Sequence, residues 1–377
     1  MEEGATHPAA APAGFDWRRT GMLLLLAATE TAALPGISAA GATPASRRQT
    51  AAADAELLWL GPAARRPHAL PPLPAGVSPA LISHAVLREL DLRHQLQVVD
   101  LGCAVAPAIP HLRLPGLEGA GPAACLSTGR AMEALRVRAL VARGRRWGRR
   151  WVERWGCSRP LLLAECVPGG TSTAQAVLQG LGVEAAGLVS GSLRQPAHQR
   201  KTDLAAAGLA RGLGQGQGRP APAVAVLAAV GDPMQALAAG LVVEAGAAGV
   251  PLLLAGGSQM AAVLALALAL AAPAERAPIA AAASVATTAW VAQEPHSDLA
   301  LLLERLGARW GVQARLAVAG LRFHGCASQA LRDYERGFVK EGVGAGGLAV
   351  LWQRLGRDPQ DLAQACDLLC GQLGDPL

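Results

Sequence analysis

Lysine is almost absent from this chain of 377 residues. Among its 34 basic residues only Lys201 and Lys340 are lysine, and all the others are arginine. A nucleotide bias toward Arg, Ala, Gly and Pro codons accounts for such a deficit. Under that bias, the surviving lysines mark candidate positions where a compact ammonium group serves and a planar guanidinium does not.

Aromatic and charged residues are also scarce, at 3% and 16% of the chain, whereas hydrophobic residues make up 51%. This composition excludes an intrinsically disordered chain, because the apolar surface is large enough to offset the entropy of ordering. The 44 glycines follow no triplet period, which excludes a collagen-like chain. The length fits one large α/β domain or two smaller ones.

The net charge of +6 has a local source. Residues 130–159 hold ten arginines and two glutamates, so the remainder of the chain is slightly acidic. The same stretch places Trp147, Trp151 and Trp155 on one face of a helix. We expect a buried tryptophan seam with a solvated arginine face, and a subunit contact along the tryptophans is the alternative. No nucleic-acid-binding module accompanies these arginines, so we expect no nucleic-acid partner.

Neither cysteine nor histidine follows the spacing of a metal site. The seven cysteines contain no CxxC pair, and Cys366 and Cys370 have no histidine nearby. We therefore expect no metal, and reduced thiols in the cytoplasm.

A membrane span is considered for residues 251–274, which carry no charge. The polar and glycine residues 256–259 interrupt this run, and the rest is too short to cross a bilayer. A strand, a turn and a buried helix explain it better, so we expect no membrane partner. The apolar run 22–28 is likewise expected to be a buried first strand and not a signal peptide.

Short apolar runs alternate with helical patterns along the chain. We expect strands at 22–28, 96–101, 161–164, 223–229, 251–255, 279–285 and 313–319, and helices at 79–90, 127–155, 171–181, 199–213, 234–247, 259–271 and 297–306. This alternation predicts a doubly wound α/β fold with a mostly parallel sheet, helices on both faces and a smaller helical portion. We expect a flexible segment at 1–20, the main domain with its helical subdomain at 21–355, and a C-terminal helix and tail at 356–377.

Four glycine-containing loops follow expected strands or precede expected helices, at 165–173, 231–234, 256–259 and 338–347. None has the GxxxxGK[ST] pattern, and none is a GxGxxG run that stands directly after the first strand of the fold. Together they favour a phosphate-bearing ligand, because helix N-termini attract anions.

Two carboxylates in these loops are candidate acid–base groups. Glu165 stands beside a Gly-Gly turn, and Glu341 stands between Lys340 and a glycine-rich run. Burial or neighbouring charge can tune a carboxylate to act near neutral pH. A surface or capping role is the alternative for each, and Asp232 is expected to be a turn or capping residue. His198, near Lys201, is expected at the surface.

Five segments, taken in order, resemble the nicotinate-nucleotide:dimethylbenzimidazole phosphoribosyltransferase family, and most of all its related proteins in archaea and cyanobacteria. They are residues 29–41, 165–173, 231–234, 254–260 and 337–347. The resemblance implies an α/β sheet fold, a homodimer and a place in cobalamin assembly. The implied reaction moves phosphoribose from nicotinate mononucleotide to a benzimidazole-type or purine base, without a cofactor.

The resemblance also implies roles for individual residues. Glu341, in the run Glu-Gly-Val-Gly-Ala, matches the family's general base, and Glu165 matches a second functional glutamate. Lys201 is the match for a phosphate-binding lysine. The implied substrate-binding set is completed by Gly169, Gly170, Thr171, Ser172, Asp232, Gly256, Gly257, Gly342 and Gly344. A non-catalytic nucleotide-binding protein of the cobamide pathway is the alternative function.

Overall fold

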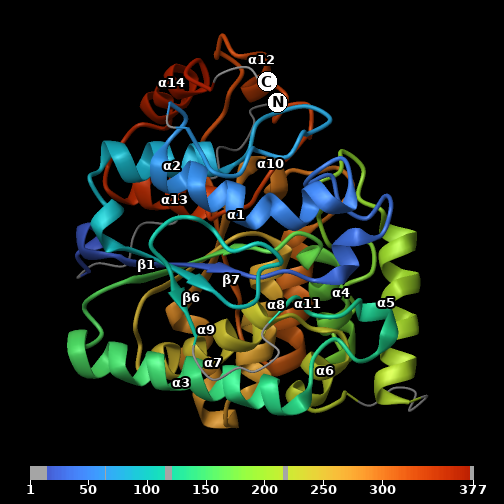
Figure 1. Ribbon diagram of the computed structural model, residues 1–377. Helices are drawn as coiled ribbons and strands as arrows, with labels where there is room; N and C mark the ends of the chain where they lie inside the picture. The colour runs from blue at the N-terminus through green and yellow to red at the C-terminus, as the bar shows by residue number, and fades with distance from the viewer. Residues whose placement is uncertain (1–14, 64, 115–120, 215–219, 374–377) are drawn as a thin grey trace, which may run out of the picture.

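The computed structural model describes residues 15–63, 65–114, 121–214 and 220–373, and these residues build one seven-stranded parallel sheet (Figure 1). The strands are β1 (Gly21–Leu26), β2 (Leu96–Asp100), β3 (Leu112–Arg113), β4 (Leu161–Cys166), β5 (Leu252–Ala255), β6 (Ala283–Thr288) and β7 (Arg315–Ala319). Their order in the sheet is β3-β2-β1-β4-β5-β6-β7, and every neighbouring pair is parallel. The predicted doubly wound α/β class is confirmed.

Helices cover both faces of this sheet, because successive strand residues point to opposite sides and both sides are apolar. Leu24 and Leu26 of β1 enter one core, whereas Leu25 enters the other. The first core is shared with α1 (Pro44–Leu60), α2 (Ala80–Glu89), α13 (Ala345–Arg354) and α14 (Pro359–Cys370). The second is shared with α3 (Ala134–Trp155), α4 (Gly170–Gly180), α5 (His198–Leu213), α6 (Ala223–Val230), α7 (Pro233–Ala247), α8 (Ser258–Leu270), α9 (Pro273–Ala282) and α11 (Leu299–Trp310). In Figure 1, α1, α2 and α13 lie above the sheet, and α3, α7 and α9 lie below it.

The other helical elements of the described residues are short. These are α10 (Ala289–Ala292), α12 (Gln329–Arg332) and the 3-10 turns Trp17–Arg19, Glu30–Ala33, Arg93–Gln95 and Leu126–Thr128. Most of the expected N-terminal segment 1–20 lies outside the described residues. Within the described part, Trp17 is buried in the core above the sheet, and the Arg354 guanidinium stacks on its ring. At the other end of the chain, Leu362 and Leu369 of α14 enter that same core.

The strand order places a switch point at β1. The chain leaves β1 toward β2 on one side, and later strands continue from β4 on the other side. In open parallel sheets a ligand crevice forms outside the carboxyl ends of the strands at such a point. The loops after β1, β4, β5 and β6 are therefore where the site is expected.

Two expected strands are wrong in whole or in part. Residues 223–229 form helix α6, and residues 279–282 are the last turn of α9, so that β6 begins only at Ala283. Both runs are continuously apolar, and such a run has no period that separates a buried helix from a buried strand. Residues 251–274 do form a strand followed by a helix. No helix among the described residues has the length and hydropathy needed to cross a membrane.

The arginine-rich helix α3 packs in a different way from the predicted tryptophan seam. Its buried positions include Gly144 and Gly148, where a β-carbon would overlap the backbone of α7 at Leu237 or press on it at Leu241. Glycines let the two helix backbones approach closely. Trp147 and Trp151 pack against the edge of the same core, so the predicted tryptophan seam is only partly buried. Trp151 and Trp155 are only half-buried, and the Arg159 guanidinium lies over both rings.

Candidate active site

A cavity of about 1160 Å³ opens at the carboxyl ends of the central strands. Its walls come from five parts of the chain, and each is either a loop after a strand or a connection that reaches over the sheet. They are residues 38–40, 69–79, 165–171, 190–195 and 338–343, with further contributions from α1 and from the start of α8. Glu165 and Glu341 both line this cavity, so the structure brings the two predicted carboxylates together.

The Glu341 carboxylate is held by four donors. Its Oε1 accepts hydrogen bonds from the backbone N–H of Gly342 at 3.1 Å and of Gly346 at 3.0 Å. Its Oε2 accepts from the Thr287 hydroxyl at 2.8 Å and from the Thr288 N–H at 3.0 Å. These bonds stabilise the ionised form, whereas burial raises the pKa of Glu341 above its ordinary value. The result is an oriented carboxylate with increased proton affinity.

The loop that carries Glu341 has an unusual backbone. Val339, Lys340 and Val343 adopt positive φ angles of 67°, 70° and 55°. Side chains with a β-carbon, and β-branched ones above all, rarely adopt this conformation, and each instance costs about 1–3 kcal/mol. The loop is held in place by surrounding bonds: the Thr288 hydroxyl donates to the Lys340 carbonyl, and the Val343 N–H donates to the Glu165 carbonyl. Strain concentrated beside a cavity is typical of functional sites.

The glycines after Glu341 permit close packing under the loop. A β-carbon at Gly346 would overlap the Thr287 backbone and Oε2 of Glu341. A β-carbon at Gly344 would lie 2.6 Å from Cβ of Ala164. Only glycine lets the start of α13 rest directly on β4 and β6 and deliver its N–H group to Glu341.

Glu165 lies deeper than Glu341, near the end of β4, and its side chain is buried. Its Oε2 accepts the N–H of Val167 at 3.1 Å. Burial, followed by the charge of Glu341, raises the pKa of Glu165 to about 8. At neutral pH the Glu165 carboxyl is therefore protonated, and it neighbours a Glu341 side chain whose two oxygens accept four hydrogen bonds, an arrangement that suits separate acid and base roles.

Two helix N-termini reach the cavity. Gly169, Gly170 and Thr171 line it at the start of α4, and Gly257 and Ser258 line it at the start of α8. A β-carbon at Gly170 would overlap the Gln259 side chain, so glycine is needed where the two helix starts meet. The free N–H groups and the dipoles of such termini attract anions.

Several predicted site residues lie behind the lining and not in it. Ser172, with a hydroxyl that has no partner among the described residues, is buried in the first turn of α4. Gly256 is buried beside Glu165, and Gly344 lies behind Gly342, which does line the cavity. Asp232 caps α7 and accepts the Thr173 hydroxyl at 2.6 Å.

Lys201 is also buried behind the lining. Its Nζ donates to the Ser190 carbonyl at 2.6 Å, and burial lowers its pKa to about 7. The ammonium group thus contacts the cavity wall from behind. His198, one turn earlier on α5, is partly buried, and its ring bonds to the His296 carbonyl.

Comparisons with known proteins identify the family of the chain. A family model described as a phosphoribosyltransferase matches residues 90–303. The chain belongs to this phosphoribosyltransferase family. The UPF0284 protein of Parasynechococcus marenigrum (strain WH8102) is 52% identical over 93% of this chain and 87% of its own length. That of Prochlorococcus marinus (strain MIT 9313) is 49% identical over 95% of this chain and 88% of its own length.

Solved structures with the same fold support the architecture. One is a nicotinate-nucleotide-dimethylbenzimidazole phosphoribosyltransferase from Thermus thermophilus, with a TM-score of 0.54 and 20% identity. The match covers 93% of this chain and 83% of that one. A structure of CobT from the same organism gives a TM-score of 0.56 at 21% identity, over 93% and 84% of the two chains. At this identity the likeness establishes the fold.

The candidate site includes residues that sequence reasoning missed. Asp54 of α1 lines the cavity together with Ser78 and Cys166, and its carboxylate accepts the Ser78 hydroxyl at 2.6 Å. Burial raises the pKa of Asp54 to about 6. An acidic residue within an alanine-rich run, after the helix-start pattern Thr43-Pro44, is the signal that could have found it.

We looked for side chains that could bind a metal ion among the described residues. Within residues 15–373, apart from the undescribed gaps, no group of three or more His, Cys, Asp or Glu side chains is arranged to hold an ion. The seven cysteines are all free thiols.

Proposed function

We propose that this phosphoribosyltransferase moves the phosphoribosyl group of nicotinate mononucleotide to a benzimidazole-type or purine base. The product is the α-ribazole phosphate, or its purine counterpart, that supplies the lower ligand of a cobamide. The proposal includes the cytoplasmic location and the homodimer that the family resemblance implies.

The oriented Glu341 carboxylate is the observation that carries this proposal. Four donors fix it at the wall of a cavity large enough for two substrates, and burial raises its pKa. A carboxylate in this state is suited to accept a proton from the ring of a bound base. Its negative charge is also suited to stabilise a ribose that becomes positive during transfer.

The reaction needs only proton and electron-pair movements. A lone pair on the acceptor nitrogen forms a bond to C1 of the ribose, while the bond from C1 to the nicotinate nitrogen breaks. The electron pair of the broken bond passes to the pyridine ring, which leaves as nicotinate. The proton that the acceptor ring loses passes to Glu341. Glu165, protonated at neutral pH, adds no second negative charge and can donate a hydrogen bond.

The helix starts at α4 and α8 supply the groups that suit a phosphate. Residues of both helix starts, Thr171 among them, line the cavity. The proline-rich connection 69–79 and the residues Phe338 and Val339 line it as well, and they suit a flat aromatic base. A lining that combines helix starts with apolar residues supports a nucleotide donor and an aromatic acceptor.

A screen of acceptor bases tests the function directly. Purified protein is incubated with nicotinate mononucleotide and, in separate reactions, with 5,6-dimethylbenzimidazole, benzimidazole or adenine, and products are separated and weighed by mass spectrometry. We expect nicotinate release matched by a new ribosyl product with at least one base. Nucleotide binding by calorimetry without product from any base would instead support a non-catalytic nucleotide-binding protein.

A further inference from the structure

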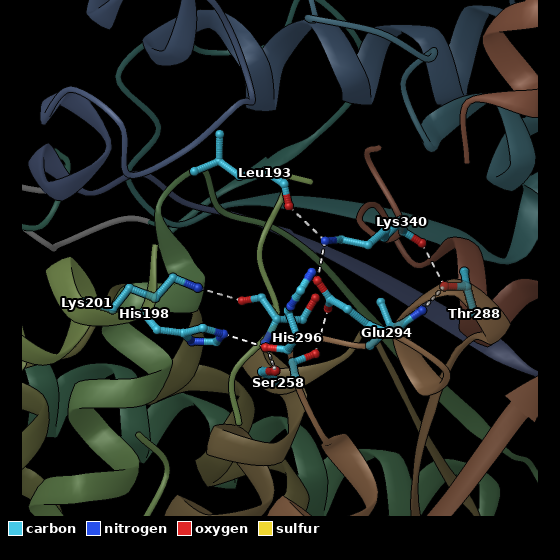
Figure 2. A network of polar contacts seen from close by, with 11 residues as sticks. Leu193, His198, Lys201, Ser258, Thr288, Glu294, His296 and Lys340 are labelled. Atoms are coloured by element: carbon cyan, nitrogen blue, oxygen red, sulfur yellow. Dashed lines mark hydrogen bonds and ion pairs between the residues drawn. The ribbon is translucent and has the colours of Figure 1, made fainter. Parts of the chain in front are cut away.

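Both lysines of the chain hold the same wall of the cavity, Lys201 from behind it and Lys340 from the neighbouring part of the lining. The loop 190–195 lines the cavity, and its carbonyl groups are the acceptors. Nζ of Lys201 donates to the Ser190 carbonyl at 2.6 Å, and Nζ of Lys340 donates to the Leu193 carbonyl at 2.8 Å. Figure 2 shows the two ammonium groups approaching the loop from different segments.

A buried carboxylate accompanies the two lysines. Glu294 accepts a bond from Nζ of Lys340 at 2.5 Å, and its other oxygen accepts the Ser297 hydroxyl at 2.6 Å. Lys201 and Lys340 are each 1% exposed and Glu294 is 8% exposed. Buried charges need partners: Lys340 pairs with Glu294, and Lys201 donates to the Ser190 carbonyl. When all three groups are ionised, two cations face one anion, and the cluster carries one excess positive charge beside the cavity.

Although carbonyl groups of the loop accept bonds from the lysines, several of its backbone N–H groups donate no hydrogen bond to another described residue. The N–H groups of Gly191, Ser192 and Leu193 donate no hydrogen bond within the part of the chain that the structure describes. The loop is fixed at its start as well, because the Ser190 N–H donates to the Ser258 hydroxyl at 3.1 Å. A run of free N–H groups in a rigid loop is suited to an anion.

Lys340 connects this loop to the Glu341 loop. Its side chain holds Leu193, its carbonyl accepts the Thr288 hydroxyl at 2.7 Å, and the next residue is Glu341 itself. Thr288 also donates its N–H to the Glu341 carboxylate. The backbone of Lys340 takes a positive φ of 70°, so the chain keeps this contact at the expense of local strain.

We propose that Lys201, Lys340 and Glu294 are positioning residues that fix the loop 190–195 relative to Glu341 and present its N–H groups to the phosphate of the nucleotide. The proposal rests on the function proposed above and names how that site holds its donor substrate. The lysines act through the loop. An ammonium group donates to one carbonyl in a narrow space, whereas an arginine side chain is longer and its planar fork needs more partners. This requirement explains why lysine persists at these two positions.

The test compares two ligands on a double variant that leaves neither member of the Glu294–Lys340 pair without its partner. The double variant Glu294→Gln/Lys340→Met removes both charges of the pair, and Glu89→Gln, which removes an exposed pairing with Arg88, is the matched control. Calorimetry gives the affinity for nicotinate mononucleotide and for its riboside, which lacks the phosphate. We expect the preference for the nucleotide over the riboside to fall at least tenfold in the double variant and to stay unchanged in the control. A general loss of structure would weaken both ligands together.

The single variant Lys201→Arg provides a second measurement that keeps the charge. We expect it to remain folded with a lowered Tm, because the longer side chain enters a buried space, and to lose at least threefold of the same preference. A folded double variant, or a folded Lys201→Arg, that keeps the wild-type preference would overturn the proposal. If the wild type binds the nucleotide but turns over no base, the proposed function fails, and the affinity ratios still decide the positioning role.

Discussion

Replacing Glu165 by glutamine should stabilise the protein, and by more at neutral than at acidic pH. The Glu165 side chain is buried, and its pKa rises from 4.5 to about 8 because of burial first and the Glu341 charge second. The folded state therefore retains a proton that the unfolded state releases above pH 4.5. Since the folded pKa is the higher one, stability is lost as the pH rises from 4.5 toward 8.

The magnitude follows from the two pKa values. One pKa unit corresponds to about 1.4 kcal/mol, so ionisation favours the unfolded wild type by about 3 kcal/mol at pH 7 but by less than about 1 kcal/mol at pH 5. Glutamine removes this term while its carbonyl can still accept the Val167 N–H. With an unfolding entropy of about 2.1 cal/mol/K per residue, 3 kcal/mol corresponds to about 4 °C in Tm for a chain of 377 residues.

Thermal unfolding followed by circular dichroism at pH 5 and pH 7 measures this effect. The relevant quantity is the difference in Tm between Glu165→Gln and wild type at each pH. Asp54 and Asp232, whose pKa values burial also raises to about 6, contribute equally to both proteins and cancel. Glu89→Gln, at an exposed position, should show no such difference. A gap in Tm that is the same at both pH values, or a less stable Glu165→Gln at pH 7, would refute the reasoning.

Two further predictions concern the support of Glu341. In Thr287→Val the Glu341 carboxylate loses one of its four donors, so the pKa of Glu341 should rise. The acidic limb of the pH profile of kcat/KM should then move about one pH unit higher. An unmoved limb would contradict Glu341 as the base. In Gly346→Ala the new β-carbon overlaps Oε2 of Glu341, and steady-state assays should show kcat lowered at least tenfold, whereas Gly325→Ala, which adds a methyl group in open space, should match wild type. Equal kcat in the two glycine variants would show that the close packing under the loop is not required.

The sheet and the two carboxylates are predictable because each leaves a local signal. Apolar runs bounded by glycine and proline mark most of the strands, and the glycine-rich segments after Glu165 and Glu341 mark places where the backbone approaches closely. The strand predicted at residues 223–229 is wrong because a short and wholly apolar run looks alike in a helix and in a strand. Pro222, which caps α6, is the only local hint of the helix.

The remainder of the site depends on contacts between distant segments. Glu294 meets Lys340 across 46 residues, and Ser78 meets Asp54 across 24, and neither pair forms a motif. The rarity of lysine draws attention to Lys201, yet only the fold shows that its ammonium group holds a backbone carbonyl behind the cavity wall. Sequence reasoning identifies residue types suited to a task, whereas the direction of a buried side chain follows from packing.

The central claim is that Glu341 acts as the base in transfer of phosphoribose from nicotinate mononucleotide. The most direct measurement is nicotinate release with 5,6-dimethylbenzimidazole or the best acceptor base, for wild type and for Glu341→Gln, with nucleotide affinity measured on both. Glutamine keeps the size of the side chain but cannot take the proton, so we predict a kcat at least about 100-fold lower with nucleotide affinity within threefold of wild type. Release by Glu341→Gln at the wild-type rate would contradict the account.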